Sequence, residues 1–504
     1  MTKRRAVVIG GGHNGLICGA YLAKAGFKVT VFEARDAVGG AIARREFADG
    51  FFAPGLAHTT HVFQGVVDDL AIVTTASAEA AETIALDREG AHLTLTDNDV
   101  EGAGLPEADR TAYRDFVSEY ASYADALTPL LTNAPPRLKN FDRRDGVTLA
   151  KIGWKLRFGL GGDPMREFLR VGGMNIYDIL NEKFADERLK AAIALDAVMG
   201  HHMAPRTPAT VLTYLQRRFA RQKGVAVSVA ALQDAAVRVG VEIRTNAKID
   251  RVIVEDGKAR GVVLASGETC DADIVASNAD AKSTFLRLVG ARALDGLFVH
   301  RISKTRTNGD VAKIHLALSA APPFNGLSPD RLNARMVIAP TQQYVEHAFN
   351  ASKYGAFTER PVLEIMTPSA IDTGYAPSGA HVLSVNAAYA PCALKGGWEN
   401  DREAFLEAVL NVLDEYAPGL KRLVQSHEIL TPVDIEAEYH MSGGHWHHGE
   451  MAIDQSFMMR PVHGAAQYQT PIEGLYLCGA AAHPGGDVTG LPGRNAAKRV
   501  IDTH

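Results

Sequence analysis

Cysteine is scarce in this sequence. Its 504 residues include four cysteines, far apart and with no C-x-x-C pair, namely Cys18, Cys270, Cys392 and Cys478. This spacing argues against a disulfide framework, a zinc site or a dithiol redox centre. The chain therefore suits a reducing compartment, and it lacks the dithiol that disulfide-reductase chemistry needs.

Long apolar runs and an excess of basic residues are also missing. No run approaches the ~20 apolar residues that span a bilayer. The first predicted strand begins at Ala6, so we expect no signal or transit peptide and a cytoplasmic protein. With 53 basic and 58 acidic residues the net charge is −5 and no basic stripe stands out, which argues against nucleic-acid binding. The length predicts roughly two or three domains.

The strongest pattern lies at the start of the chain. A short apolar run at 6–9 predicts a strand, and the string GGGHNG follows it directly. Residues 16–25 predict a helix and residues 28–32 a second strand. Strand, glycine turn, helix and strand in this order form the βαβ unit that binds dinucleotides.

Each glycine of this unit has a physical task. Gly10 allows the tight turn off the strand, and Gly12 lets the backbone approach a pyrophosphate. Gly15 lets the helix pack close to the strand. The helix N-terminus then offers free N–H groups and the positive end of its dipole to the phosphates. Glu33 can accept hydrogen bonds from ribose hydroxyls, and an acid there disfavours a 2′-phosphate, so the ligand is FAD or NAD rather than NADP.

Two further features favour FAD. A second glycine pair, Gly39-Gly40, followed by Ala41, comes just after the ribose acid and is typical of FAD proteins. A strand at 475–478 leads into another glycine-rich loop and a helix from about Gly490. We therefore expect an α/β fold, a Rossmann-like FAD-binding domain with an inserted mixed α+β substrate domain. We assign 1–75, 220–295 and 465–504 to the FAD-binding domain, and 76–219 and 296–464 to the substrate domain.

Periodicity outlines the remaining elements. It predicts helices at 106–132, 163–200, 228–239 and 402–416. It predicts strands at 242–244, 251–254, 261–264, 273–277, 311–318, 335–339, 362–367 and 381–389, with a hairpin turn at 255–259.

Residues 148–160 form a basic amphipathic segment that contains Trp154 and Phe158. The segment has two interpretations. A helix packed on its own domain with its lysines outward is favoured, and a peripheral contact with a membrane surface is the alternative.

The two terminal motifs, GGGHNGLICGAYLAKAGFKVTVFEARDAVGGA and LYLCGAAAHPGGDVTGLPGRNAA, together resemble the phytoene-desaturase-like FAD oxidoreductases of the amine oxidase and carotenoid desaturase superfamily. The sequence looks most like the branch that contains pyridine nucleotide-disulphide oxidoreductase domain-containing protein 2. The internal strings GVEIRTNAKIDRVIVEDGKARGVVLASGETCDADIVASNAD, MTPSAIDTGYAPSGAHVLSVNAAYAP and SGGHWHHGEMAIDQSFMMRP agree with it. The resemblance covers most of the chain and is least clear at 76–200.

The resemblance implies a set of cofactor contacts. The N-terminal loops would hold the pyrophosphate and ribose, strand 249–253 would pass beside the adenine, and the C-terminal loop with its helix would meet the pyrophosphate and the flavin. The residues concerned are Gly10, Gly12, Gly15, Glu33, Ala34, Gly39, Gly40, Ala41, Val252, Gly479, Gly490, Pro492 and Asn495.

Catalytic candidates come from the same comparison. GDVAKIHLAL resembles a strand of amine oxidases whose lysine holds a water at flavin N5, so Lys313 is the analogous position; a strand-end lysine facing solvent is the alternative. Asp487 stands where relatives usually show glycine, and it either acts in catalysis or caps a turn. His448 and Glu450 lie in a family-like string, and His483 lies in the C-terminal loop over the predicted flavin position.

Histidine is abundant, with 18 residues and two clusters at 201–202 and 440–448. Adjacent histidines in a glycine-flanked loop do not have helical ligand spacing, and no cysteine accompanies them, so we predict no metal site. Histidines in a flavin enzyme can orient substrate or move a proton near neutral pH. The alternative for each of them is a position on the surface or behind the residues that line the site.

These observations predict an FAD-dependent oxidoreductase that moves a hydride from a C–H bond of a small or lipophilic substrate to flavin N5. The product would carry a new C=C bond, as in desaturases, or a C=N bond, as in amine oxidases. Oxygen, a quinone or another acceptor would reoxidise the flavin. A nicotinamide-only dehydrogenase and a non-enzymatic FAD-bound interaction protein are the other classes.

Overall fold

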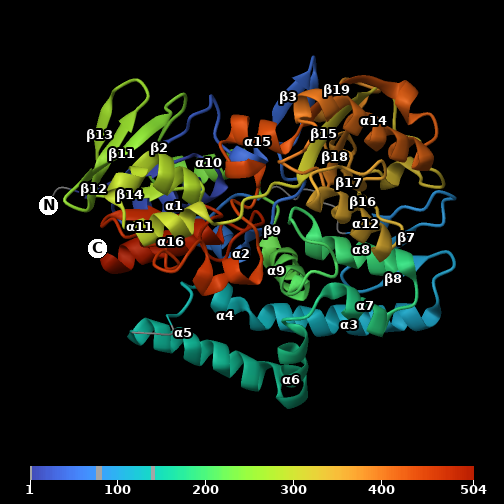
Figure 1. Ribbon diagram of the computed structural model, residues 1–504, viewed down its shortest axis with the longest axis horizontal. Coiled ribbons are helices and arrows are strands. Elements are labelled where there is room, and N and C mark those ends of the chain that lie inside the picture. The colour runs from blue at the N-terminus through green and yellow to red at the C-terminus, as the bar shows by residue number, and fades with distance from the viewer. Residues whose placement is uncertain (1–2, 75–81, 138–141) are drawn as a thin grey trace.

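The computed structural model describes residues 3–74, 82–137 and 142–504 (Figure 1). The domain boundary that we place at 75/76 lies outside the described residues. Both chain termini lie beside the same group of strands, at the left of Figure 1.

A five-stranded parallel sheet contains the N-terminal βαβ unit. Its strands draw on distant parts of the chain, in the order β10 (Glu242–Arg244), β2 (Lys28–Phe32), β1 (Arg5–Ile9), β14 (Ile274–Ser277) and β20 (Leu475–Leu477). Val, Ile and Ala dominate β1 and β14 at the centre of the sheet, as expected for parallel strands buried on both faces. The predicted α/β class is confirmed.

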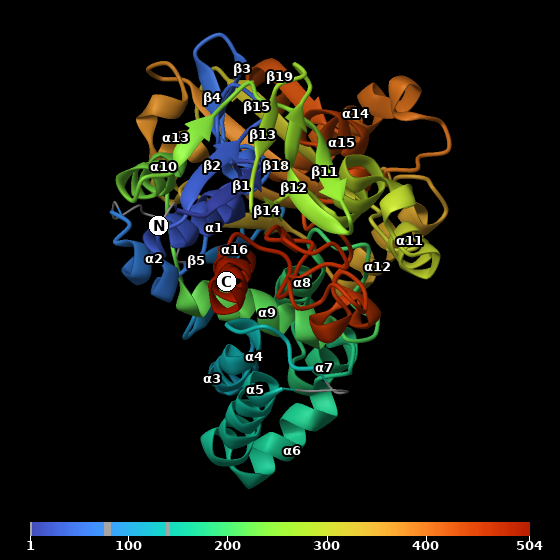
Figure 2. The same ribbon diagram turned by 90° about the vertical axis from the view of Figure 1, so that its left-hand side faces the viewer.

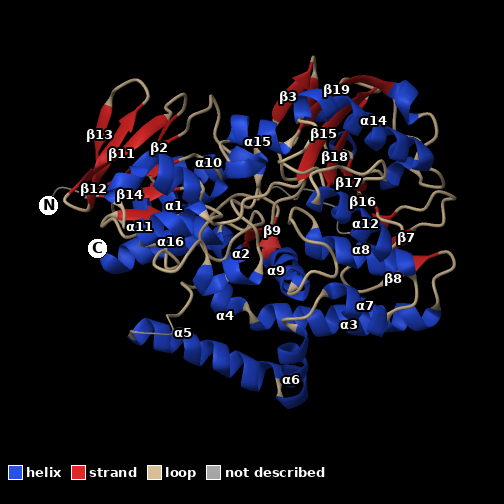
Figure 3. Cartoon of the chain, viewed as in Figure 1, coloured by secondary structure: helices blue, strands red, loops and turns tan. Residues whose placement is uncertain are grey.

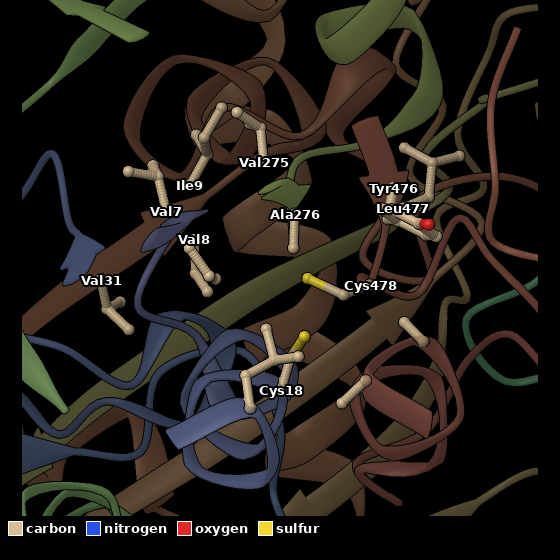
Figure 4. Close-up of a cluster of buried hydrophobic side chains, with 14 of the residues drawn as sticks. Val7, Val8, Ile9, Cys18, Val31, Val275, Ala276, Tyr476, Leu477 and Cys478 are labelled. Carbon is tan, nitrogen blue, oxygen red and sulfur yellow. The ribbon is translucent and has the colours of Figure 1, made fainter. Parts of the chain in front are cut away.

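Helices cover this sheet and close its core. α1 (His13–Lys24) packs against α16 (Leu491–Thr503) and α10 (Val229–Arg238), so the two ends of the chain lie in contact. Figure 4 shows Cys18 of α1 and Cys478 after β20 among the valines of the central strands. Both cysteines are free and fully buried, where they pack as small apolar side chains.

A three-stranded antiparallel sheet flanks the parallel sheet. It consists of β11 (Ile249–Glu255), β12 (Lys258–Leu264) and β13 (Thr269–Asp271). The predicted hairpin joins β11 to β12, and Asp256 and Gly257 turn there with positive φ. β13 was not predicted from the sequence.

An eight-stranded mixed sheet forms the other half of the molecule, at the right of Figures 1 and 3. Its four predicted strands adjoin one another, while β19 and the three short strands β6 to β8 were not predicted. The order is β19 (Val424–Leu430), β15 (Val311–Leu318), β18 (His381–Ala388), β17 (Val362–Met366), β16 (Arg335–Ile338), β6 (Thr83–Ala85), β7 (Leu93–Leu95) and β8 (Val100–Gly102).

Helices α3 to α9 lie below the two sheets in Figure 1. The predicted helical stretch at 106–132 is divided at Leu127, and the stretch at 163–200 forms three helices. The elements are α3 (Glu107–Ala126), α4 (Thr128–Leu131), α5 (Arg143–Trp154), α6 (Gly162–Val171), α7 (Ile176–Lys183), α8 (Glu187–Val198) and α9 (Thr210–Lys223).

Shorter elements complete the fold. Two small antiparallel pairs are β3 (Arg45–Ala48) with β4 (Phe51–Ala53), and β5 (Val62–Phe63) with β9 (Gly224–Val225). The other helices are α2 (Gln64–Leu70), α11 (Gly296–Ser303), α12 (Gln342–Lys353), α13 (Pro368–Ile371), α14 (Trp398–Tyr416) and α15 (Pro432–Tyr439). Among the described residues, no helix is both long and apolar enough to cross a membrane.

α5, the π-helical segment Lys155–Leu160 that continues it, and α6 form a hairpin that extends away from the two sheets (Figure 2). We call residues 143–171 the helical hairpin. It contacts α3 and α4 along one side, and Lys155 pairs with Asp125 of α3. Trp154 and Phe158 are nevertheless 67% and 63% exposed, so its aromatic side chains face outward as well as its basic ones.

Candidate functional site

A cavity of about 660 Å³ is lined by residues from both halves of the molecule. One end lies at the carboxyl ends of the parallel strands, where Ile9, Phe32 and Asn278 contribute to its wall. Ligands of open α/β sheets bind at this edge. The other end reaches the eight-stranded sheet through Glu364 and Asn386.

The glycine loop after β1 is closely packed. Gly10 has a φ of +93°, and a Cβ on Gly15 would lie 2.0 Å from the Gly10 carbonyl oxygen. Gly12 caps α1 without a side-chain hydrogen bond, and no acidic residue lies in the first turn, so no side chain of the helix itself caps its N-terminus. An anion cradle at this helix end, as the glycine spacing predicts, stays a prediction.

The second glycine pair lies directly against the first loop. Gly39 N–H donates to the Gly11 carbonyl at 2.9 Å, and Gly12 forms a parallel bridge with Gly39. A Cβ on Gly40 would lie 3.2 Å from the Gly12 Cα. Gly10, Gly12, Gly40 and Ala41 all line the cavity. The two glycine loops therefore pack backbone against backbone beside the cavity, and there is no room for side chains between them.

Glu33 is buried at the end of β2 and lines the cavity together with Ala34. Its Oε2 accepts a hydrogen bond from Gly11 N–H at 2.8 Å, and its Oε1 accepts one from Arg35 N–H at 3.0 Å. These bonds hold the carboxylate beside the glycine loop.

The other predicted cofactor residues lie around this cavity rather than in its wall. Two of them make contacts between segments that surround the cavity. A Cβ on Gly479 would lie 2.4 Å from the Asn278 carbonyl oxygen, so the two backbones are in close contact. Asn495 Nδ2 donates to the Leu131 carbonyl at 3.0 Å. Ala480 and Val488 of the C-terminal loop line the cavity instead. The residues outside the wall are Gly15, Gly39, Val252, Gly479, Gly490, Pro492 and Asn495, and their cofactor roles stay predictions.

Two of the five catalytic candidates line the cavity. Burial lowers the pKa of His448, and its Nδ1 has no hydrogen-bond partner among the described residues. Burial raises the pKa of Asp487, while the nearby Arg217 opposes that rise. Asp487 has a φ of +61° and donates its N–H to His447 Nδ1 at 3.2 Å.

Lys313 lies behind the cavity wall. It is fully buried in β15, and its Nζ donates to Asn386 Oδ1 at 2.9 Å. Burial lowers its pKa well below the usual value. The alternative of a lysine facing solvent is therefore wrong, because the side chain is fully buried and hydrogen-bonded to Asn386, which lines the cavity.

Glu450 and His483 are buried outside the cavity wall. Glu450 pairs with Arg306 at 2.7 Å and accepts a hydrogen bond from Asn308 at 2.8 Å. His483 Nε2 lies 2.8 Å from the Leu130 carbonyl oxygen, and burial lowers its pKa to about 4. Glu450 therefore links its loop to the segment of Arg306 and Asn308, and His483 links the C-terminal loop to α4.

The sequence did not predict a cluster of buried charged and polar side chains at the far end of the cavity. We call it the charged end: His58, Arg217, Arg335, Glu364 and Asn386, all of which line the cavity. Arg335 Nε donates to Glu364 Oε1 at 2.6 Å, and Asn386 Nδ2 donates to Glu364 Oε2 at 2.6 Å. A charged residue within an apolar strand, as in RMVI and VLEIM, was the available signal.

The two histidine clusters at 201–202 and 440–448 are in contact through His201 and His447. His201 and His447 stack with ring centroids 4.7 Å apart, and burial lowers the pKa of both well below the usual value. No group of three or more His, Cys, Asp or Glu in residues 3–74, 82–137 and 142–504 is arranged to hold a metal ion.

The cavity fits an FAD molecule chemically. Two glycine loops and the bare end of α1 suit a pyrophosphate, and the fixed Glu33 carboxylate suits a ribose. His13 Nε2 and His448 Nδ1, from residues of the cavity wall, lack a partner within the described chain. Buried polar atoms of this kind are usually satisfied by a ligand or water.

Comparison with known proteins agrees with this assignment. The family model described as flavin containing amine oxidoreductase matches residues 15–501. The mouse pyridine nucleotide-disulfide oxidoreductase domain-containing protein 2 is 32% identical, and the alignment covers 98% of this chain and 93% of that protein. A lycopene-forming phytoene desaturase of Pseudescherichia vulneris is 24% identical, with 97% and 96% coverage.

The fold is shared with solved structures. Putrescine oxidase bound to putrescine superimposes with a TM-score of 0.62 at 15% identity, over 100% of this chain and 99% of that chain. The resemblance inferred from the terminal motifs is confirmed, and so is FAD as the cofactor of an oxidoreductase. The chain belongs to the flavin-containing amine oxidoreductase family.

Proposed function

We propose that this oxidoreductase dehydrogenates an organic substrate at a C–H bond. One observation carries the proposal: a single cavity joins the glycine loops to the charged end. When bound, FAD supplies the acceptor for a hydride. The protein's part is to orient the substrate, exclude water and handle the proton.

The proposed roles follow from the positions of the side chains. Gly12, Gly40 and the N-terminus of α1 hold the pyrophosphate, and Glu33 holds the ribose. His448 is the proposed proton acceptor, because burial favours its neutral form and its Nδ1 is unpaired among the described residues. Asp487 faces the same space from the C-terminal loop.

The proposed product carries either a new C=C bond or a new C=N bond, and oxygen or a quinone is the proposed acceptor that reoxidises the flavin.

Anaerobic mixing of the yellow protein with amines, polyenes and cyclic alkenes tests the proposal. We expect one class to bleach the flavin bands and to yield a product with two fewer hydrogens, while free FAD stays oxidised. A protein that keeps its flavin oxidised with every class would be an FAD-bound interaction protein instead.

We also retain two structural proposals from the sequence. One is the division into a discontinuous FAD-binding domain and a substrate domain. The other is a peripheral membrane contact through residues 148–160, which belong to the helical hairpin. Within α5, which is described in full, Asp145 alone is buried. Val147, Lys151, Trp154 and Phe158 follow one another at helical spacing on its exposed side.

Charge supports a lipid surface as the partner of this hairpin. Lys151 precedes Trp154 by one helical turn, and Arg157 lies between Trp154 and Phe158; neither makes an ion pair with any described residue. The Arg157 guanidinium lies 5.6 Å from the centre of the Phe158 ring. Aromatic rings beside unpaired basic side chains suit the headgroup region of an anionic membrane.

A further inference from the structure

Arg460 is a cationic side chain in the protein interior that the proposed mechanism does not use. The residue is 2% exposed, so its guanidinium is shielded from bulk water. All of its side-chain hydrogen bonds within the described chain go to backbone carbonyl oxygens, and none goes to a carboxylate. Arg460 is therefore a buried positive charge without an ion-pair partner among the described residues.

The guanidinium lies between the segment that begins at His447 and the loop that contains Ala480. Its Nε and Nη2 donate to the Ala480 carbonyl oxygen at 3.0 and 2.8 Å. In the other segment, Nη2 donates to the His447 carbonyl at 2.6 Å and Nη1 to the Glu450 carbonyl at 2.9 Å. Two longer hydrogen bonds of 3.3 Å reach the carbonyls of Gly449 and Gln455. His447 and Ala480 both line the cavity, so Arg460 lies directly behind its wall.

Carboxylates of neighbouring segments are bound to other groups. Glu450 and Asp454 share one partner, Arg306, at 2.7 Å each. The Asp454 side chain is 61% exposed, so water screens its charge. Asp280 is buried, and its carboxylate accepts four hydrogen bonds from serine hydroxyls and N–H groups. Within the described chain, no carboxylate in contact therefore cancels the charge of Arg460.

The charge of Arg460 persists although burial disfavours it. A neutral side chain of similar size would avoid the cost of burying a charge without a counter-ion. The carbonyl dipoles offset part of that cost, because a guanidinium presents five N–H donors in a fixed fork. Burial lowers the pKa of Arg460 to about 9, which still leaves the group charged at neutral pH. The protein therefore holds a positive charge beside a cavity in which it would stabilise negative charge.

FAD, when bound in this cavity, is the group on which negative charge develops. A hydride carries two electrons and one proton, so FAD gains one negative charge when it accepts a hydride. We propose that Arg460 is a positioning residue of the flavin site whose buried charge raises the reduction potential of bound FAD and so favours hydride uptake. Its hydrogen bonds hold the His447 segment and the Ala480 loop together at the cavity wall. The inference rests on FAD as the cofactor and holds for any substrate, so it goes beyond the proposed dehydrogenation.

The midpoint reduction potential of bound FAD, measured by anaerobic equilibration with a reference dye, tests the proposal without a substrate. Arg460→Met should shift this equilibrium toward oxidised FAD by at least about tenfold, which is about 30 mV for a two-electron couple. Arg460→Lys keeps the charge and should stay close to the potential of the parent protein. Arg499→Met is the matched control and should leave the potential unchanged. Arg499 of α16 donates to the neutral Gln469, forms no ion pair with a described residue and does not line the cavity.

If Arg460→Met does not retain FAD, Arg460→Gln keeps amide donors for the Ala480 carbonyl without a charge, and it should lower the potential in the same way. An unchanged potential in the uncharged variants would overturn the proposal. An equal fall in Arg460→Lys would also overturn it, because the potential would then depend on the geometry of the loops rather than on the charge. Loss of FAD from all three Arg460 variants would assign the residue to the fold alone and contradict the proposal as well.

Discussion

At the residue scale, the glycines of the first loop are the best-determined part of the site. Gly15 lies inside α1, where alanine normally stabilises a helix by ~1 kcal/mol relative to glycine. Its Cβ would nevertheless lie 2.0 Å from the Gly10 carbonyl oxygen, which cannot move without opening the turn. The close approach therefore outweighs helix propensity at this position.

We expect Gly15→Ala to lose bound FAD and to lower the midpoint of thermal unfolding. The ratio of flavin to protein absorbance and a melting curve measure both effects. Gly153→Ala is the matched control, because Gly153 lies in α5 with no atom within 4 Å of its added Cβ. The control should raise the free energy of unfolding by ~0.5–1 kcal/mol. A Gly15 variant that behaves like the control would refute the close packing.

Lys313 provides a second test at this scale. If its contact with Asn386 orders a water near the flavin, as the amine-oxidase interpretation holds, Lys313→Met should slow reoxidation by oxygen at least about tenfold, a change of ~1.4 kcal/mol in the barrier. Stopped-flow mixing of the reduced protein with oxygen measures the rate. Lys190→Met, at another buried lysine, is the control. An unchanged rate would remove this role from Lys313.

At the element scale, the sequence predicted the apolar strands of the eight-stranded sheet and missed its short or polar ones. The strands β15 to β18 are apolar runs of four to eight residues and were found. β6, β7 and β8 have three residues each, which is too short for a period to show. β19, with the sequence VQSHEIL, is half exposed and carries polar residues.

The residues of the candidate site could likewise be predicted only where a local sequence pattern contains them. The glycine loop and Glu33 lie within one βαβ unit, where local spacing is informative. Arg217, Arg335 and Glu364 meet only because α9, β16 and β17 pack together, and no local pattern records that meeting. Lys313 could be placed by resemblance, but its burial depends on the strands on either side of β15.

For the helical hairpin we predict that its two exposed aromatic side chains contribute to binding of a lipid surface. The double variant Trp154→Ala and Phe158→Ala should weaken binding to vesicles of phosphatidylglycerol and phosphatidylcholine by about tenfold or more, because each aromatic side chain contributes ~1.5–3 kcal/mol when buried. Co-sedimentation measures the bound fraction. Tyr354→Ala removes an exposed aromatic ring elsewhere and should leave binding unchanged. Equal sedimentation of all three proteins would contradict a lipid contact.

At the scale of the whole molecule, buried neutral histidines link stability to pH. The pKa of His483 is about 4 in the folded protein and 6.5 in an unfolded chain. As pH falls from about 6.5 to about 4, the unfolded state takes up a proton that the folded state excludes. Stability is then lost by up to ~1.4 kcal/mol per pH unit, and above about pH 6.5 this group contributes nothing to the slope.

Urea unfolding at pH values from about 7.5 to about 5, which cover the upper part of the range in which the protonation difference develops, measures the dependence of stability on pH. His483→Gln should have a shallower slope than the parent, by up to about one proton below pH 6.5. His13, His58 and His61 should maintain part of the slope, since burial lowers the pKa of each. Identical slopes for parent and variant would show that His483 is not held neutral by its surroundings.

The central claim joins both halves of the molecule: a substrate held at the charged end gives up a hydride toward the cofactor held by the glycine loops. The most direct test is anaerobic single-turnover reduction of the flavin by a reactive substrate and by the same substrate with deuterium at the reacting carbon. The account predicts that the flavin bands bleach more slowly with the deuterated substrate. Equal rates, in a step shown to follow binding, would contradict cleavage of that C–H bond in the reduction of the flavin.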